Sequence, residues 1–149
     1  MNTQQEELKK RLSVIESEAQ SIRKIIEDND NPKNIMDVIK TFQDACDSPH
    51  VTKEELAFLS VQDSLCPHIV ALCKITVISK ALNEGKILTL KDDRYYPYFD
   101  VSSGFVFRFT YYGDSFAHTS SASRLCFKTE KLAAYAGTQF PDEYKAASV

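Results

Sequence analysis

The sequence lacks the segments and motifs that would assign it to a membrane or to a familiar class of enzyme. No apolar run is long enough to cross a bilayer, and the opening stretch, MNTQQEELKKRL, contains no apolar signal segment. No P-loop is present, and no GxGxxG, GxSxG or HExxH pattern. These absences predict a cytosolic protein that has no contact with a membrane and is not an enzyme.

An excess of positive charge is missing as well. The 149 residues include 18 Lys and Arg against 21 Asp and Glu, for a net charge of -3. This balance argues against the broad basic surface that binds long nucleic acids without sequence preference, although it leaves room for a local basic pocket. The four cysteines form no CxxC pair, and the three histidines lack the spacing of a metal pair. We therefore expect reduced core cysteines, no metal and no cofactor.

The N-terminal region has the pattern of a single amphipathic helix over residues 4–28. Its apolar residues are spaced 4, 3, 4, 3 and 4 apart, which is a narrow heptad seam: Leu8, Leu12, Ile15, Ala19, Ile22 and Ile26. Three heptads are only marginally stable alone, so the seam needs a partner. The helix either folds back on its own domain or pairs with another copy. The narrow stripe without aromatic residues favours self-association, as a dimer or a higher even-numbered oligomer, through residues 1–30.

Residues 31–149 have the pattern of one α+β domain. Helices are predicted for 35–48, for a turn or two within 52–62, for a central buried segment from Pro67 to just before Gly85, and for a C-terminal segment capped by Thr129 and divided by Pro141. Between them, alternating aromatic and aliphatic residues predict an antiparallel sheet of about four strands: KILTL, YYPYFDVS, FVFRFTYY and SASRLCFK. The SSG sequence at 102–104 predicts a hairpin turn, and Pro97 an edge or a bulge.

Two arginines stand among these aromatic strands. In the third strand, alternation predicts one core face, consisting of Phe105, Phe107, Phe109 and Tyr111, and places Arg108 on the opposite face. Arg124 follows a loop rich in serine and threonine, in which the hydroxyl of Ser123 is placed to help hold a phosphate. Guanidinium groups suit phosphates and aromatic rings suit bases, so the pattern fits a nucleotide pocket. The same pattern is also that of an ordinary pair of strands whose arginines face solvent.

Two further residues offer weaker indications of a functional site. Lys74 interrupts the apolar surface of the central helix, and its ammonium group either reaches solvent or is directed at a ligand or at a buried partner. His118 lies among hydroxyl residues, and the nearest acid, Asp114, is four residues away in a loop. Such a spacing fixes no catalytic pair.

Several segments together resemble a known group of proteins. FQDACDS, ITVISKALNEG, YYPYFDVSSGFVF and SRLCFKTEKLAAYAGTQFPDEYK resemble, in this order, a family of small proteins from phages and mobile elements of gut bacteria. More distantly, the pattern is similar to the first Thoeris anti-defence family. Those phage sponge proteins bind cyclic ADP-ribose isomers, and in some members cyclic oligonucleotides, without degrading them. The resemblance runs from about Thr41 to Lys145 and is most specific at RLCFK…LAAYAG.

The resemblance implies a phage protein that captures a cyclic nucleotide signal in the host cytoplasm. In the sponge family, basic residues and an aromatic residue contributed across a dimer hold the ligand. The matching positions are Arg124, Phe99 and Lys74, and Arg108, Tyr98 and Ser123 are candidates beside them. Two departures bear on ligand choice: Ala122 replaces a frequent glycine, and a lysine at 74 cannot make the bidentate contact of an arginine.

A second function is compatible with the same sequence. The chain would then be a structural or protein-interaction component of a phage or mobile element, with no small-molecule ligand. Capture of a protein partner that persists after loss of Arg124 would favour this alternative.

Overall fold

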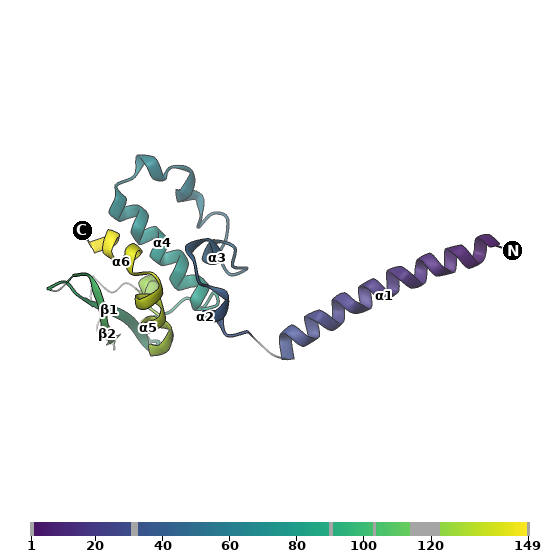
Figure 1. Cartoon of the computed structure of the whole chain (residues 1–149). Helices are drawn as coiled ribbons and strands as arrows, with labels where there is room; N and C mark the ends of the chain where they lie inside the picture. Colours follow the sequence, from purple (N-terminus) through teal and green to yellow (C-terminus); the bar gives the residue numbers. More distant parts are fainter. Residues whose placement is uncertain (1, 31–32, 90, 103, 114–122, 149) are drawn as a thin grey trace. The chain divides into compact units, whose positions relative to one another are not determined.

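The chain divides into two compact units, Met1–Asn34 and Ile35–Val149, in this computed structural model (Figure 1). The structure describes residues 2–30, 33–89, 91–102, 104–113 and 123–148. The first unit consists of one helix, α1 (Asn2–Asp30), which includes the whole segment predicted as helical. Its apolar residues Leu12, Ile15 and Ile22 are each more than half exposed. No helix among the described residues is both long and apolar enough to span a bilayer.

The second unit begins with short helices that precede a long one. α2 (Ile35–Val38) and α3 (Phe42–Cys46) replace the single helix predicted for 35–48. The chain breaks there because Thr41 caps α3: its hydroxyl accepts from the backbone N–H of Asp44, whose carboxylate accepts in return from the N–H of Thr41. Two 3₁₀ turns, η1 (Ala57–Ser60) and η2 (Gln62–Ser64), then lead to α4 (Pro67–Leu82).

Helix α4 is the buried central helix that the sequence predicts. Its buried residues are Ala71, Ile75, Val77, Ile78, Ser79, Ala81 and Leu82. At its C-terminus Glu84 has a positive φ of 54°, and the N–H of Gly85 donates to the carbonyl of Lys80. This is the Schellman arrangement that ends many helices. Glu84 is further held by an ion pair with Lys128. The position of this helix end matters because the candidate site lies beside it.

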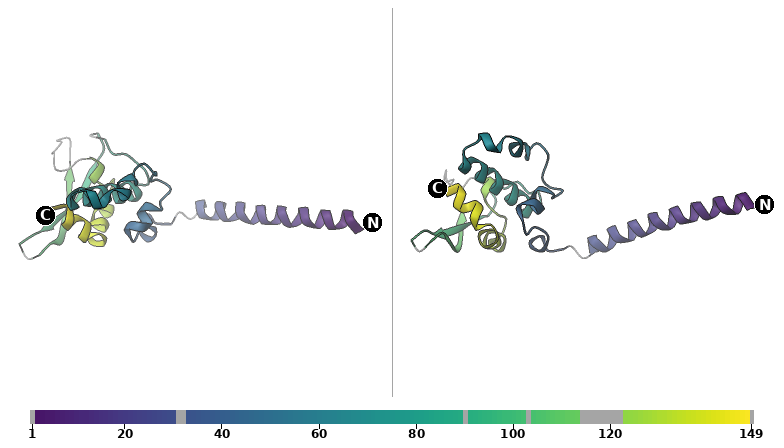
Figure 2. Two further views of the ribbon diagram at one scale, coloured as in Figure 1. Left: turned by 90° about the horizontal axis from the view of Figure 1, so that it is seen from above. Right: turned by 45° about the horizontal axis from the view of Figure 1, so that its top comes forward.

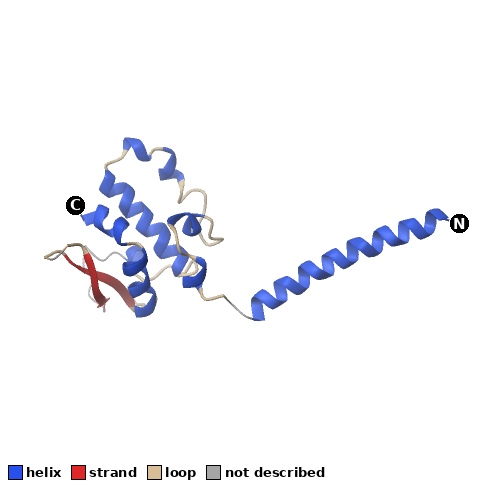
Figure 3. Ribbon diagram, in the orientation of Figure 1, coloured by secondary structure: helices blue, strands red, loops and turns tan. Residues whose placement is uncertain are grey.

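The sheet is smaller than predicted. Among the described residues it has two antiparallel strands, β1 (Arg94–Asp100) and β2 (Val106–Gly113), and not about four (Figure 3). Residues 86–89 form no strand, because the carboxylate of Asp92 accepts from both the N–H and the hydroxyl of Thr89 and closes a turn. In place of the strand predicted over 121–128, the described part has a short 3₁₀ helix, η3 (Ser123–Leu125), and one bridge, Tyr95 to Phe127.

A bulge in the hairpin changes which aromatic residues face inward. Tyr98 pairs with Phe109 and Phe99 with Phe107, so that Arg108 is the extra residue of β2. Phe107 therefore turns toward α5 with Pro97, whereas Phe109 and Tyr111 remain about half exposed on the outer face. The prediction that these two residues belong to the core is wrong, because a strict alternation does not survive the bulge.

The C-terminal helices complete the core. α5 (Glu130–Gln139) starts at the predicted cap, where the Thr129 hydroxyl accepts from the N–H of Leu132, and α6 (Pro141–Ser148) follows the predicted break. α5 lies against the hairpin, and α6 packs along α4 (Figures 1 and 2). Leu132, Ala133 and Ala136 of α5 join a core whose largest fully buried apolar side chains are Ile39, Ile78, Leu82, Cys126 and Phe127. Of the other cysteines, Cys46 and Cys73 are partly buried and Cys66 is exposed, so the prediction of four core cysteines is wrong for Cys66.

Candidate functional site

A basic hollow lies where the C-terminal half of α4 meets η3 and the segment after α4. It has a volume of about 390 Å³, counted together with the open solvent at its mouth. Three cations line it, Lys80, Lys86 and Arg124, together with one acid, Glu55. The remaining lining residues are polar groups of α4 and two apolar residues after it: Thr76, Ser79, Asn83, Ile87 and Leu88. The structure thus places Arg124, a predicted site residue, in a positively charged concave surface.

Buried hydrogen bonds fix the segment that carries Arg124 to the end of α4. The side-chain amide of Asn83 donates to the carbonyl of Cys126 at 2.8 Å, and its oxygen accepts from the N–H of Lys128 at 2.9 Å. The Ser79 hydroxyl donates to the same Cys126 carbonyl at 2.7 Å. On the other side, Phe127 exchanges two backbone hydrogen bonds with Tyr95 of β1. Residues 126–128 are therefore anchored both to the helix and to the hairpin, and η3 precedes this anchored segment directly.

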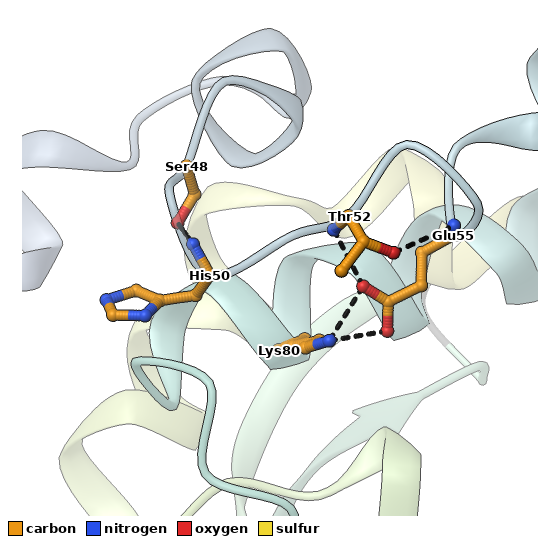
Figure 4. A network of polar contacts seen from close by, with 5 residues as sticks. All are labelled: Ser48, His50, Thr52, Glu55 and Lys80. Carbon is orange, nitrogen blue, oxygen red and sulfur yellow. Dashed lines mark hydrogen bonds and ion pairs between the residues drawn. The ribbon is translucent and has the colours of Figure 1, made fainter.

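Lys80 is held in place by a carboxylate from the loop before α4. Its ammonium group lies 2.6 Å and 2.7 Å from the two oxygens of Glu55 (Figure 4). The N–H of Thr52 also donates to Glu55, which completes the capping box predicted for this loop. The hydrogen bond from Lys80, followed by that from Thr52, lowers the pKa of Glu55. The lysine at this position is therefore compensated and well oriented.

The other two cations differ in how their charge is balanced. Lys86 lies 2.9 Å from a carboxylate oxygen of Asp92, and this contact, more than any other, lowers the pKa of Asp92. Arg124 is exposed and, within the described parts of the chain, forms no ion pair. Among the described residues, its guanidinium is thus the positive charge of the hollow that has no carboxylate partner. A planar fork of donors in such a position suits a phosphate or a carboxylate.

The surroundings of Lys74 are different. Its ammonium group lies 5.3 Å from the ring centroid of Phe42, in a cation–π contact. The hollow that it lines is a separate one and contains three acids, Asp63, Asp142 and Glu143. These carboxylates disfavour an anion. In the single chain, the structure does not bring Lys74 to Arg124.

The remaining predicted residues lie on the hairpin. Phe99 stacks on Phe105 at 4.4 Å and contacts Tyr144 at 5.1 Å, between the ring centroids, so it contributes to the packing of the hairpin on α6. Tyr98 is half exposed and stacks on Phe109.

Arg108 stands at the bulge, 3.7 Å from Asp100, and is largely exposed. Neither it nor the two aromatic residues lines the hollow of Arg124.

Part of the predicted site lies outside the described residues. This applies to Ala122 and to the part of the serine- and threonine-rich loop before Ser123, and His118 and Asp114, whose spacing fixes no catalytic pair, lie outside them as well. Ser123 itself is the first residue of η3. Within the described ranges, no group of three or more His, Cys, Asp or Glu side chains is placed to hold a metal ion.

Sequence reasoning missed Lys80, Lys86 and Asn83. Each of them has a feature in the sequence that gains meaning only once the structure is known. Lys80 and Lys86 flank the Asn-Glu-Gly end of a helix, where cations commonly balance the helix dipole. Asn83 is a polar residue at the end of a strongly apolar helix, and its near-complete burial follows from the return of the chain at 126–128. That return is a long-range contact which no local spacing encodes.

Comparisons with protein-family models, with curated proteins and with solved structures found no match for this chain.

Proposed function

We propose that this protein binds an anionic, nucleotide-derived signal in the hollow of Arg124 and holds it without degrading it. The ligand class is a cyclic ADP-ribose isomer or a cyclic oligonucleotide, and the setting is the host cytoplasm during phage infection. The charges of the hollow support an anionic ligand. The resemblance to sponge proteins supports a nucleotide as that ligand. The proposal includes no chemical step, in keeping with a sequence that carries none of the common catalytic motifs sought in it.

The observation that carries the proposal is the uncompensated charge of Arg124. Two lysines of the same hollow are already paired with carboxylates, whereas the guanidinium is exposed and unpaired among the described residues. Because carboxylates already neutralise both lysines, the guanidinium of Arg124 is the charge that would attract a bound phosphate. A charge-assisted contact of this kind is about twice as strong as a neutral hydrogen bond.

The size of the hollow limits what it can take. Without the open solvent at its mouth its volume is only about 50 Å³, well below the range of roughly 300 to 1,000 Å³ seen for small-molecule sites. The hollow therefore suits the phosphate-bearing part of a nucleotide. The bases would extend beyond it, where another copy of the chain would contribute the aromatic contact that Phe99 or Tyr98 provides in the predicted site.

The test is a binding screen on the full-length protein. Cyclic ADP-ribose isomers and cyclic di- and trinucleotides are titrated by calorimetry, and the complex is then heated so that the released compound can be weighed by mass spectrometry. We expect release of the intact compound. Arg124→Ala should weaken binding by roughly tenfold to more than a hundredfold, the effect of losing one charge-assisted contact of about 1.5 to 3 kcal/mol. Arg124→Lys should retain part of the affinity.

Arg108→Ala is the matched control. It removes the same charge from the same unit, but from the bulge of β2, where Asp100 compensates it. Affinity should stay within about threefold of the native value, as for a surface substitution away from the site. The proposal is wrong if no compound of the panel binds, if a hydrolysed product is released, or if Arg108→Ala weakens binding as much as Arg124→Ala.

One observation favours the alternative, a protein-interaction component. The outer face of the hairpin exposes about half of each of several large side chains, namely Tyr98, Val106, Phe109 and Tyr111. An exposed patch of this kind is typical of a surface that contacts another protein. Capture of a protein partner by the Arg124→Ala variant, lost on Phe109→Ser, would favour this function over the capture of a nucleotide.

A further inference from the structure

The helix α1 presents an apolar seam to solvent. Along its 29 residues, Leu12, Ile15 and Ile22 are 56%, 59% and 57% exposed. They occupy the a and d positions of the heptad pattern, with Leu12 at a and the two isoleucines at d. Covering side chains of this size with a partner is favourable, because it removes apolar surface from water. A helix of this composition is marginally stable without a partner that covers the seam.

The charged residues beside the seam have a definite order. With Leu12 at a, the g positions on one edge include Arg11 and Glu18, and the e positions on the other edge include Glu16 and Arg23. All four side chains are exposed. In coiled coils, residues at e and g determine which helices pair and in which direction. The order of positive and negative charges along the two edges can therefore be compared with a parallel and with an antiparallel partner helix.

A parallel, in-register second copy matches these charges. In this arrangement each g residue faces the e residue five positions later on the other helix. Arg11 then faces Glu16 of the second copy, and Glu18 faces Arg23 of the second copy. By symmetry each attraction occurs twice. Arg11 also lies 3.3 Å from Glu7 of its own helix, and a guanidinium has enough donors to serve both carboxylates.

An antiparallel copy with full overlap places like charges together. Here e residues face e residues and g residues face g residues across the seam. Glu16 faces Glu16 of the second copy, Glu18 faces Glu18, and Lys9 faces Arg23. Like charges at such positions destabilise pairing by amounts similar to the gain from opposite charges. Ala19, in the centre of the seam, has a small side chain and contributes little apolar packing. These charges therefore have a larger effect on whether the two helices pair parallel or antiparallel.

We infer that α1 binds a second copy of the same helix, parallel and in register, through the seam from Leu8 to Ile26. The charge order at the four flanking positions carries this inference, and the exposed apolar seam supplies the affinity. The assembly needs no ligand, and it goes beyond the proposed capture of a nucleotide. A parallel arrangement brings the N-termini of the copies close together.

Charge reversal at one cross-helix pair tests the inference on the full chain without ligand. Glu18→Arg and Arg23→Glu each replace two attractions in a dimer by two repulsions. Each should raise the dissociation constant measured by sedimentation velocity by roughly tenfold or more. The double variant Glu18→Arg/Arg23→Glu restores the opposite charges between the two positions that face each other in the parallel register. Its dissociation constant should return to within about threefold of the native one.

Lys10→Glu is the control, because it reverses a charge at the f position, away from the seam, and should leave the dissociation constant unchanged. Far-UV circular dichroism verifies that each variant remains helical. As a second measurement, pyrene attached to the N-terminal amine should give excimer fluorescence, whereas antiparallel helices of 29 residues would separate the labels by about 43 Å. A monomeric native protein, an unrestored double variant or the absence of excimer emission would each overturn the inference.

Discussion

At the scale of single residues, Asn83 organises the candidate site more than any charged group does. It is 3% exposed, and its side chain joins the end of α4 to the segment that follows Arg124. Buried amides are tolerated only when their donors and acceptors are satisfied, and here the backbone of residues 126–128 satisfies them. The position of Arg124 in the hollow therefore depends on a neutral residue.

We expect Asn83→Ala to lower the free energy of unfolding by about 2 to 3 kcal/mol. The substitution leaves the partly buried N–H of Lys128 without its acceptor and removes one donor from the buried Cys126 carbonyl. Urea denaturation followed by circular dichroism measures this loss. Gln139→Ala is the control, because its amide makes a similar bond to the carbonyl of Lys40 at 2.8 Å but is exposed, so its loss should be about 1 kcal/mol or less. Equal losses in the two variants would refute the role of burial.

At the scale of elements, the contact between α5 and the hairpin depends on the absence of a side chain at Gly137. A Cβ built there would lie 2.4 Å from Cδ2 of Phe107 and 2.7 Å from Cβ of Pro97. The helix can lie this close to both strands only because the position is glycine. The buried face of the hairpin, and with it the bridge from Tyr95 to Phe127, is positioned by this approach.

Gly137→Ala should therefore destabilise the protein, although the same change in an exposed helix interior stabilises by roughly 1 kcal/mol. We expect a loss of about 2 kcal/mol or more, because the added methyl group meets backbone-fixed atoms of Pro97 and a ring held against α5. Thr138→Ala, one residue further along the helix and exposed, gives the ordinary propensity effect for comparison. Thermal unfolding of the two variants shows whether each substitution stabilises or destabilises the protein. A higher midpoint for Gly137→Ala than for the native protein would contradict the close packing.

The elements also show where prediction from sequence stops. Local signals located the long helices well: Pro67 and Thr129 each mark a helix start, and the break at Pro141 is where it was expected. The number of strands and the inward face of β2 were wrong. A bulge of one residue reverses the alternation, and the turn at Asp92 competes with a strand through side-chain bonds. Neither the bulge nor the turn changes the spacing of apolar residues in the sequence, so neither can be predicted from that spacing.

At the scale of the whole molecule, one of the six binding residues predicted from the sequence lines the candidate hollow, and the other five do not. Arg124 lines this hollow together with Lys80 and Lys86. Phe99, Lys74 and Arg108 lie elsewhere in the same unit. Which cations converge depends on contacts between residues more than forty positions apart, such as Asn83 with Lys128. Spacing along the chain cannot encode such contacts. It can encode the order of charges on a single helix, as in α1.

The two units make separable contributions, and a deletion tests this division. Among the side chains that the structure describes, all buried apolar ones lie between Ile39 and Phe140, so the second unit contains the packing that determines its own fold. Removing residues 1–34 should leave the near-UV circular dichroism of Ile35–Val149 and its melting temperature nearly unchanged, because no buried side chain of this core is lost. The mass measured by light scattering should fall to that of a single truncated chain, because the exposed seam of α1 is gone. A truncated protein that loses its near-UV signal would show that α1 supports the fold, and one that keeps the mass of the native assembly would place the contact between copies on the second unit.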